Sequence, residues 1–390
     1  MRDGWIETTL DGIADYINGY PFKPTDLGDV GLPVIRIKQL LDPNEPVDRT
    51  ETDTPDRCLL RDGDIVFSWS GTLAVRIWNR GPAKLNQHLF RVVEKKNVYK
   101  GIIPLILDHA IDELEEKSHG TTMKHITKQT LLPHKVLLPP LPEQKRIVDL
   151  ISSVDSYIKA LQQLLESAKR SRNAVLHELL TAGGADWVET TLGEVTQINP
   201  EQARDFDSER LIKYVDLSTV TFDNGIDSEI DPIPFNEAPG RARRIVREND
   251  VIVATVRPYL KGFAFVNKDF NEQIASTGFC VIRAESELIL PELVWALVGS
   301  DDFVDFLIRR STGSSYPAVR PIDISEFNFM LPPFKDQKTV SQLIRTFDQL
   351  IKDSTNLISS TQNLRSGLLS DLLSEEHEIP ASYDKVMGAA

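Results

Sequence analysis

The sequence predicts an α+β protein built from two copies of one unit, in which a β-rich globular part precedes one long helix. Two repeats support this fold class. Trp5–Leu10 (WIETTL) returns as Trp187–Leu192 (WVETTL). The run from Leu138 to Thr181 returns from Leu331 onward with a shift of 193 residues and 16 identities in 44 positions. Self-similarity of this extent indicates an internal duplication.

Short apolar and β-branched runs in both globular parts predict strands, because Gly, Pro, Asn or Asp residues bound each of them. The clearest predicted strands cover 32–37, 64–67, 250–253 and 279–282. Helical patterns cover 102–116 and 291–310. The turn sequences at 61–66 and 247–252 correspond, so we expect the two globular parts to share a fold with mainly antiparallel, twisted sheets.

Each copy ends in a long predicted helix with apolar residues at alternating spacings of four and three. Pro142 suits the first turn of the first helix, and Gly183-Gly184 suits its end. Arg172 interrupts the seam of the first helix; Ser354, Thr361 and Arg365 interrupt that of the second. A seam of about 40 residues needs a partner helix, and the other copy is the nearest candidate.

The apolar stripe on each helix is wider than a two-helix seam requires. We interpret the surplus as a docking face for another protein, although such residues can also cover the globular parts. The residues assigned to this spacer and docking role are Leu150, Ile151, Val154, Tyr157, Leu164, Leu343, Ile344, Phe347, Leu350 and Leu357.

Composition and charge exclude several protein classes. The chain is 41% hydrophobic and 26% charged, with a net charge of −14 and a pI near 5.1. This excludes a strong non-specific nucleic-acid binder, although local basic clusters remain: residues 241–268 hold 7 basic and 2 acidic groups. Two distant cysteines predict no disulfide framework, and no stretch resembles a signal peptide or a membrane span. We therefore expect a cytoplasmic protein.

Catalytic signatures are scarce in the sequence. Phosphate-binding loops, zinc-binding HExxH helices and GxSxG elbows are absent, and the seven histidines lack ligand spacing. Asp64 followed by Glu94-Lys95-Lys96 can be aligned with a metal-dependent nuclease pattern, but the second repeat lacks this pattern and a solvated turn is the better interpretation. The prediction is a non-catalytic chain that binds no metal or cofactor itself.

Polar, aromatic and basic residues concentrate on predicted loops. Arg, Asn and Gln can read base edges, while Ser, Thr and Lys suit phosphates. The alternative for each residue is that it satisfies loop backbone groups or belongs to the core. The candidate DNA-binding residues are Ser68, Trp69, Ser70, Thr72, Arg76, Asn86, Gln87, His88, Thr121 and Lys124 in the first copy, and Arg241, Arg243, Arg244, Arg257, Tyr259, Lys261, Ser314, Ser315 and Tyr316 in the second.

With the duplication, the long helices and the two Leu-Pro-Pro…Gln-Lys junctions, the sequence resembles a specificity subunit of a type I restriction-modification system. The resemblance covers residues 5–376 and is most specific at 5–10, 187–192 and 139–144. The second junction departs from the pattern, with Phe334-Lys335-Asp336 in place of Leu-Pro-Glu.

The resemblance implies two target recognition domains, 1–140 and 185–333, which read different halves of a split site in double-stranded DNA. It implies that the helices, 141–184 and 334–376, are spacers that form an antiparallel coiled coil and dock two methyltransferase subunits; 377–390 is a tail. S-adenosylmethionine, ATP and Mg would bind partner subunits, which include restriction/translocase subunits in complexes that cleave DNA. The expected location is the prokaryotic cytoplasm, in association with the nucleoid. The alternative function is an assembly or antagonist protein that binds methyltransferase subunits without reading DNA.

Overall fold

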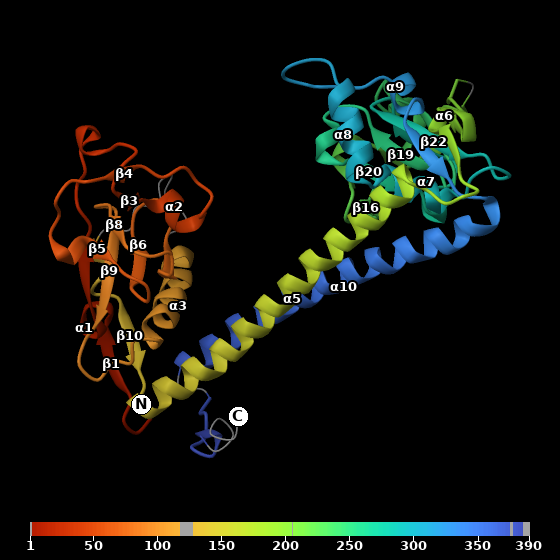
Figure 1. Ribbon diagram of the computed structural model, residues 1–390. Coiled ribbons are helices and arrows are strands. Elements are labelled where there is room, and N and C mark those ends of the chain that lie inside the picture. Colours follow the sequence, from red (N-terminus) through yellow and green to blue (C-terminus); the bar gives the residue numbers. More distant parts are fainter. Residues whose placement is uncertain (1, 118–127, 205, 375–376, 385–390) are drawn as a thin grey trace. The chain divides into compact units, whose positions relative to one another are not determined.

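The computed structural model describes residues 2–117, 128–204, 206–374 and 377–384. The chain forms two compact units (Figure 1). Unit 1 comprises Met1–Ala160 and Leu357–Ala390, and unit 2 comprises Leu161–Asn356. Each unit contains one β-rich globular part and portions of both long helices.

Unit 1 is organised around a four-stranded antiparallel sheet in the order β2-β9-β6-β7. The strands are β2 (Ala14–Asn18), β9 (Leu89–Glu94), β6 (Ile65–Ser68) and β7 (Ala74–Ile77). The helix α3 (Ile102–Lys117) contributes Ile102, Ile103 and Ile106 to the same core as Phe67 and Phe90. The predicted helix and central strand therefore pack together.

A second sheet of unit 1 has the order β4-β3-β8-β5, with β3 and β8 parallel and the other pairs antiparallel. A two-stranded ladder, β1-β10, joins the two ends of the globular part. The remaining bounds are β1 (Ile6–Thr9), α1 (Leu10–Ile13), η1 (Pro24–Asp26), β3 (Leu32–Ile35), α2 (Ile37–Leu41), β4 (Arg49–Thr50), η2 (Asp56–Cys58), β5 (Leu59–Leu60), β8 (Ala83–Leu85), α4 (Lys128–Leu131) and β10 (Lys135–Leu138).

Unit 2 repeats this plan with a sheet in the order β12-β22-β19-β20 and a smaller one, β14-β21-β18, whose β14–β21 pair is parallel. The ladder β11-β23 corresponds to β1-β10, since Leu192 N–H donates to Phe327 O as Leu10 N–H donates to His134 O. The strands are β11 (Val188–Thr191), β12 (Thr196–Ile198), β13 (Leu211–Ile212), β14 (Tyr214–Val215), β15 (Val220–Thr221), β16 (Gly225–Ile226), β17 (Ile233–Pro234), β18 (Ala242–Val246), β19 (Val251–Ala254), β20 (Phe263–Phe265), β21 (Gln273–Ser276), β22 (Phe279–Ala284) and β23 (Asn328–Leu331).

The helical pattern over 291–310 is divided between two helices, α7 (Pro291–Val298) and α8 (Asp301–Arg310). Gly299 ends α7, and Ser300 starts α8 by accepting a hydrogen bond from Phe303 N–H at 3.1 Å. The short helices of unit 2 are α6 (Leu192–Val195), α9 (Pro321–Ser325), η3 (Leu217–Thr219), η4 (Phe235–Glu237), η5 (Pro258–Leu260) and η6 (Lys268–Phe270).

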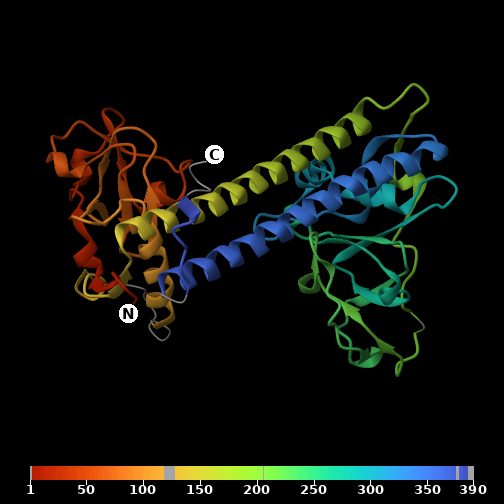
Figure 2. The ribbon, with the colours of Figure 1, turned by 90° about the horizontal axis from the view of Figure 1, so that it is seen from below.

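The long helices are α5 (Leu141–Thr181) and α10 (Phe334–Leu373), and they pair antiparallel within each unit (Figure 2). In unit 2, buried Arg172 pairs with Asp348 at 2.5 Å. In unit 1, Arg365 pairs with Asp155 at 2.5 Å. The shift of 193 residues converts one pair into the other, so the arginines that interrupt the apolar seams make the same interhelical ion pair in both units.

A buried glutamine fixes each globular part to its long helix. Gln144 Oε1 accepts from Tyr99 N–H at 2.7 Å, and its Nε2 donates to Asn97 O and Pro139 O. In unit 2, Gln337 Oε1 accepts from Leu290 N–H at 2.8 Å, while its Nε2 donates to the carbonyls of Leu288 and Pro332. The Gln of the repeated junction motif is therefore a clamp between domain and helix.

Candidate nucleic-acid interface

In unit 1, two loops that contain predicted DNA-binding residues lie together at one end of the central sheet. The loop 69–73 connects β6 to β7, and the turn 86–88 connects β8 to β9. The ring of Trp69 stacks on Phe90 at 5.7 Å and tilts against His88 at 6.2 Å. The structure thus brings Trp69 and His88, 19 positions apart in the sequence, onto one surface.

The predicted residues of these loops divide into loop supports and exposed side chains. Ser68 is fully buried and donates to Thr72 O at 2.7 Å; buried Asn86 accepts from His88 N–H at 3.3 Å. These two side chains hold the loop backbone, which was the alternative considered for them. The exposed predicted residues are Thr72, Arg76, Gln87 and His88, whereas Trp69 and Ser70 are half-buried.

The turn 86–88 rests on a segment that sequence reasoning did not select. Gln87 N–H donates to Tyr20 O at 3.1 Å, and Asn18 Nδ2 donates to Gln87 O at 3.3 Å. Gly19 is required there, because a Cβ atom would lie 2.3 Å from the carbonyl oxygens of Leu85 and Asn86. The glycine was the only sequence signal of this close approach.

Thr121 and Lys124, the other predicted DNA-binding residues of the first copy, lie outside the described residues. Whether they contact phosphates stays a prediction.

In unit 2, the loop 255–262 between β19 and β20 corresponds to the loop 69–73 and carries strained backbone. Arg257 and Lys261, which flank η5, have φ of +50° and +47°. Residues other than glycine occupy this region at an energetic cost that the surrounding contacts must offset. Tyr259 and Leu260 lie between these two residues, and Leu260 is 64% exposed.

Arg257 joins this loop to the predicted residues at 314–316. Its guanidinium lies 4.5 Å over the Tyr316 ring, and the side-chain Nη2 donates to Ser315 O at 3.2 Å. The backbone N–H of Arg257 donates to Pro317 O at 2.7 Å. Ser314, Ser315 and Tyr316 are exposed. Arg257, Ser315 and Tyr316 therefore form one surface from two segments about 58 residues apart.

Lys261 lies differently, because its Nζ pairs with Asp301 at 2.9 Å and lies 5.6 Å from the Phe222 ring centroid. Tyr259, Leu260 and Lys261 line a cavity of about 460 Å³ together with α5 residues such as Lys169 and Asn173, all within unit 2. The lysine charge is therefore already partly compensated inside the protein.

The predicted residues Arg243 and Arg244 lie in the first half of β18, and Arg241 directly precedes this strand. Arg241 O accepts from Thr277 N–H at 2.8 Å, and Thr255 N–H donates to Gly278 O at 2.9 Å, so β18 and the turn 277–278 adjoin the loop 255–262. Arg241 lies 3.4 Å from Asp216. Arg243 is exposed and lies 5.9 Å over the Phe235 ring, whereas half-buried Arg244 has a buried Nε with no hydrogen-bond partner among the described residues.

Another basic residue of 241–268 belongs to an ion-pair cluster away from these loops. Arg247 donates to both oxygens of Glu201, at 2.7 and 2.9 Å. Arg283 pairs with Asp250 at 2.8 Å and also with Glu201. The hydrogen bond from Arg247, followed by those from Arg283, lowers the pKa of Glu201 to about 2. Counting charges along the sequence therefore overestimates the basic surface of this segment.

The residues of the nuclease-like pattern have structural contacts. Asp64 accepts from Arg61 N–H at 2.8 Å, as Asp250 accepts from Arg247 N–H at 2.8 Å in the second copy. The same turn thus occurs in both units. No group of three or more metal-binding side chains occurs among the residues that the structure describes.

The helix residues assigned to docking separate into buried and exposed sets. Ile151 belongs to the core of unit 1, and Leu150 packs against it; Ile344 packs with Leu176 in unit 2. Val154 and Phe347 are half-buried. The exposed ones are Tyr157, Leu164, Leu343, Leu350 and Leu357, each between 39% and 50% exposed, and Leu364 is a further exposed leucine at the same seven-residue spacing.

Comparisons with known proteins match this architecture. A family model described as the type I restriction modification DNA specificity domain matches residues 2–170. The chain is 24% identical to the type I restriction enzyme EcoBI specificity subunit of Escherichia coli, over 99% of this chain and 92% of the relative. The chain is thus similar over nearly its whole length to a type I restriction-modification specificity subunit, and its residues 2–170 match the DNA specificity domain of that family.

Other specificity subunits show a similar relation to this chain. The MjaVIII specificity subunit of Methanocaldococcus jannaschii is 22% identical over 77% of this chain and 75% of its own. The fold matches the crystal structure of the type I S subunit from M. genitalium with a TM-score of 0.55 and 16% identity, covering 95% and 96% of the two chains. It also matches a structure determined to explain assembly and conformational transition of the type I system, with a TM-score of 0.60, 15% identity and 97% and 99% coverage.

Among the residues that the structure describes, no helix has the length and apolar character needed to cross a membrane.

Proposed function

We propose that this chain is a specificity subunit of a type I restriction-modification system, a non-catalytic DNA-reading chain whose two globular parts each recognise one half of a bipartite, asymmetric site in double-stranded DNA. One observation carries the proposal: the central sheets of the two units correspond, and at the corresponding end of each sheet the loops carry different side chains. Unit 1 places Gln87 and His88 there, and unit 2 places Arg257 and Tyr316. A shared scaffold with different side chains fits the reading of two different half-sites.

The exposed apolar residues of the long helices supply the proposed docking faces for two methyltransferase subunits. Leu164, Leu343 and Leu350 are exposed on unit 2, and Tyr157 and Leu357 on unit 1. Exposed residues at heptad spacing form a stripe that a partner helix can cover. In this proposal S-adenosylmethionine, ATP and Mg bind partner subunits, and restriction/translocase subunits join those complexes that cleave DNA. The assembly acts on DNA in the prokaryotic cytoplasm, in association with the nucleoid.

Neutralising the proposed reader of unit 2 tests DNA recognition. In the complex assembled with methyltransferase subunits, Arg257→Gln should weaken binding to the cognate duplex about tenfold or more, since a charged base or phosphate contact is worth about 1–3 kcal/mol. Lys261→Gln should have a smaller effect, because Asp301 already pairs with this lysine.

Lys268→Gln is the matched control, because it removes the same charge in η6, after β20 rather than before it. If Arg257→Gln and Lys268→Gln have equal effects, the assignment of the loop 255–262 to DNA reading is wrong. Intact sequence preference in both variants would favour the assembly or antagonist function.

Substitutions of exposed helix residues test the docking faces. Leu343→Ser with Leu350→Ser should reduce binding of a methyltransferase subunit at least tenfold without unfolding unit 2. The aspartate substitutions Ile151→Asp and Ile344→Asp are poorer tests, since both isoleucines are buried in the cores of their units. Unchanged assembly of the double serine variant would contradict the docking proposal.

A further inference from the structure

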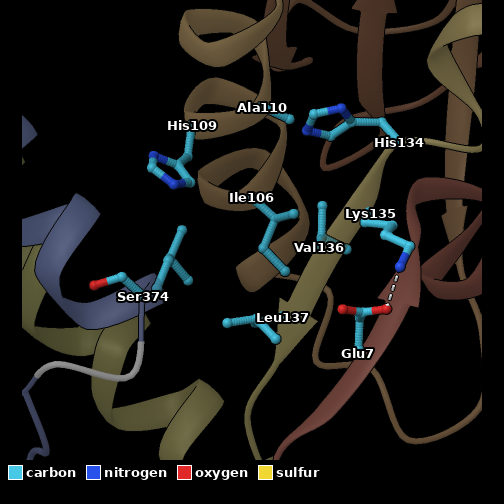
Figure 3. A pocket seen from close by; sticks show the side chains of 10 residues that line it. Glu7, Ile106, His109, Ala110, His134, Lys135, Val136, Leu137 and Ser374 are labelled. Carbon is cyan, nitrogen blue, oxygen red and sulfur yellow. Dashed lines mark hydrogen bonds and ion pairs between the residues drawn. The ribbon is translucent and has the colours of Figure 1, made fainter. Parts of the chain in front are cut away.

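A cavity of about 320 Å³ opens in unit 1 between the ladder β1-β10, the helix α3 and the end of α10 (Figure 3). Its walls include Ile106, Ala110, Val136 and Leu373. Polar groups at the cavity are His109, His134, Ser374 and the ion pair of Lys135 with Glu7 at 2.7 Å. Figure 3 shows the ring of His134 extending toward Ala110.

The internal repeat shows that the fold does not require this cavity. The shift of 193 residues places Ala110 at Phe303, His134 at Phe327 and Val136 at Phe329. The matching backbone hydrogen bonds of Leu10 and Leu192, to His134 O and Phe327 O, support this alignment at His134 and Val136. The clamps of Gln144 and Gln337 align Tyr99 with Leu290, a shift of 191, and the two residues between α7 and α8 raise the shift to 193 before Ala110.

In unit 2 three phenylalanines stand at the positions that correspond to these cavity residues. All three are buried in one core. The rings of Phe303 and Phe327 meet edge to face at 5.1 Å, and those of Phe327 and Phe329 stack at 6.4 Å. Unit 1 has smaller or more polar side chains at each of these positions, which leaves space of the kind that aromatic rings occupy in the other copy.

We propose that this cavity binds a small molecule with one planar aromatic ring and one hydroxyl group, a phenol-type compound. The ring would lie against Ile106, Ala110, Val136 and Leu373, where the aligned positions 110 and 136 carry phenylalanine in unit 2. The hydroxyl group would reach the imidazole of His134 or His109, either of which can donate or accept a hydrogen bond depending on its tautomer. The volume lies at the lower end of the range for ligand sites, which limits the occupant to a small compound.

Binding of p-cresol to the full chain, measured by saturation-transfer NMR and by calorimetry, tests the proposal. Saturable binding at one site is expected. The double variant Ala110→Phe/His134→Phe, which copies unit 2, should bind p-cresol at least tenfold more weakly. Because this variant could fail to fold, Val136→Phe alone provides a second means of filling the cavity, and a circular dichroism spectrum reports the fold of each.

Two controls make the result specific. Ile77→Phe adds a ring at an exposed position of β7 and should leave p-cresol binding unchanged. The saturated analogue 4-methylcyclohexanol, which is not planar, should bind at least fivefold more weakly than p-cresol. The proposal is overturned if wild-type protein shows no saturable binding, if folded filled variants bind as tightly as wild type, or if the two compounds bind equally.

Discussion

Replacing the junction glutamines tests whether each long helix is fixed to its globular part by a buried side chain. Gln144 is 1% exposed and Gln337 is fully buried, and each makes three hydrogen bonds to backbone groups. Alanine at either position removes all three bonds. It leaves one N–H donor and two carbonyl acceptors without their partner.

The expected cost follows from these groups. A buried donor left unsatisfied costs about 1–3 kcal/mol, and a carbonyl less, since a second lone pair or water can compensate. Together with the lost packing, Gln144→Ala should destabilise the junction of unit 1 by about 3 kcal/mol. Gln337→Ala should cost unit 2 a similar amount, because its hydrogen-bond geometry is the same.

Hydrogen exchange followed by mass spectrometry measures this effect in each unit separately, which is needed because a two-unit chain does not unfold in one step. Gln144→Ala should accelerate exchange at the Tyr99 amide roughly a hundredfold, at tenfold per 1.4 kcal/mol, and leave the Leu290 amide unchanged. Gln337→Ala should do the reverse. Gln163→Ala, an exposed glutamine of α5, is the control. An acceleration below fivefold, or equal changes at both amides, would refute the reasoning.

Three further predictions concern charge and burial. Asp348→Asn should lower the free energy of unfolding of unit 2 by about 2–4 kcal/mol, measured by denaturant unfolding, because it removes the carboxylate that pairs with the buried Arg172 guanidinium. Arg172→Met should cost less, because the Asp348 carboxylate that it leaves unpaired can still be hydrated. Equal costs of the two substitutions would contradict this. The lowered pKa of Glu201 stabilises the folded state above its unfolded pKa of about 4.5, and this contribution is lost as the pH falls through about 2. Glu201→Gln should therefore cost about 1 kcal/mol at pH 7 after allowance for screening, and progressively less between pH 4.5 and 2; a cost that is constant with pH would refute the assignment. Burial raises the pKa of the Cys280 thiol to about 12. Iodoacetamide at pH 8 should therefore not modify Cys280 until unit 2 unfolds. Rapid modification of the folded protein would show instead that Cys280 is accessible in the native state.

Much of the architecture was predictable because the duplication shows which features the fold requires. The repeated heptads predicted α5 and α10, and the shared turn at 61–66 and 247–252 predicted matching sheets. The break between α7 and α8 was missed, since a pattern of apolar residues continues across Gly299 and Ser300 while the backbone does not. Arg172 counted as an interruption of the seam, whereas it makes a buried ion pair. Such pairing depends on the partner helix, whose register the pattern of one helix cannot give.

The candidate site was less predictable than the fold. Residue type identified the loops but could not separate side chains that support a loop, such as Ser68 and Asn86, from exposed ones, such as Gln87. Leu260 was overlooked because an apolar residue suggests a core position, yet it lies exposed in a loop between two residues with positive φ, Arg257 and Lys261. Burial and backbone strain depend on tertiary contacts, so residue identity alone does not report them.

The DNA motif methylated by the assembled complex tests the central claim most directly. Sequencing of modified bases in host DNA should reveal a motif in two unequal halves separated by a fixed number of unspecified bases. In a variant carrying Gln87→Ala and His88→Ala, preference should change in one half only, and in Arg257→Gln only in the other. A continuous motif, or a change in both halves caused by a substitution in one unit, would contradict the account.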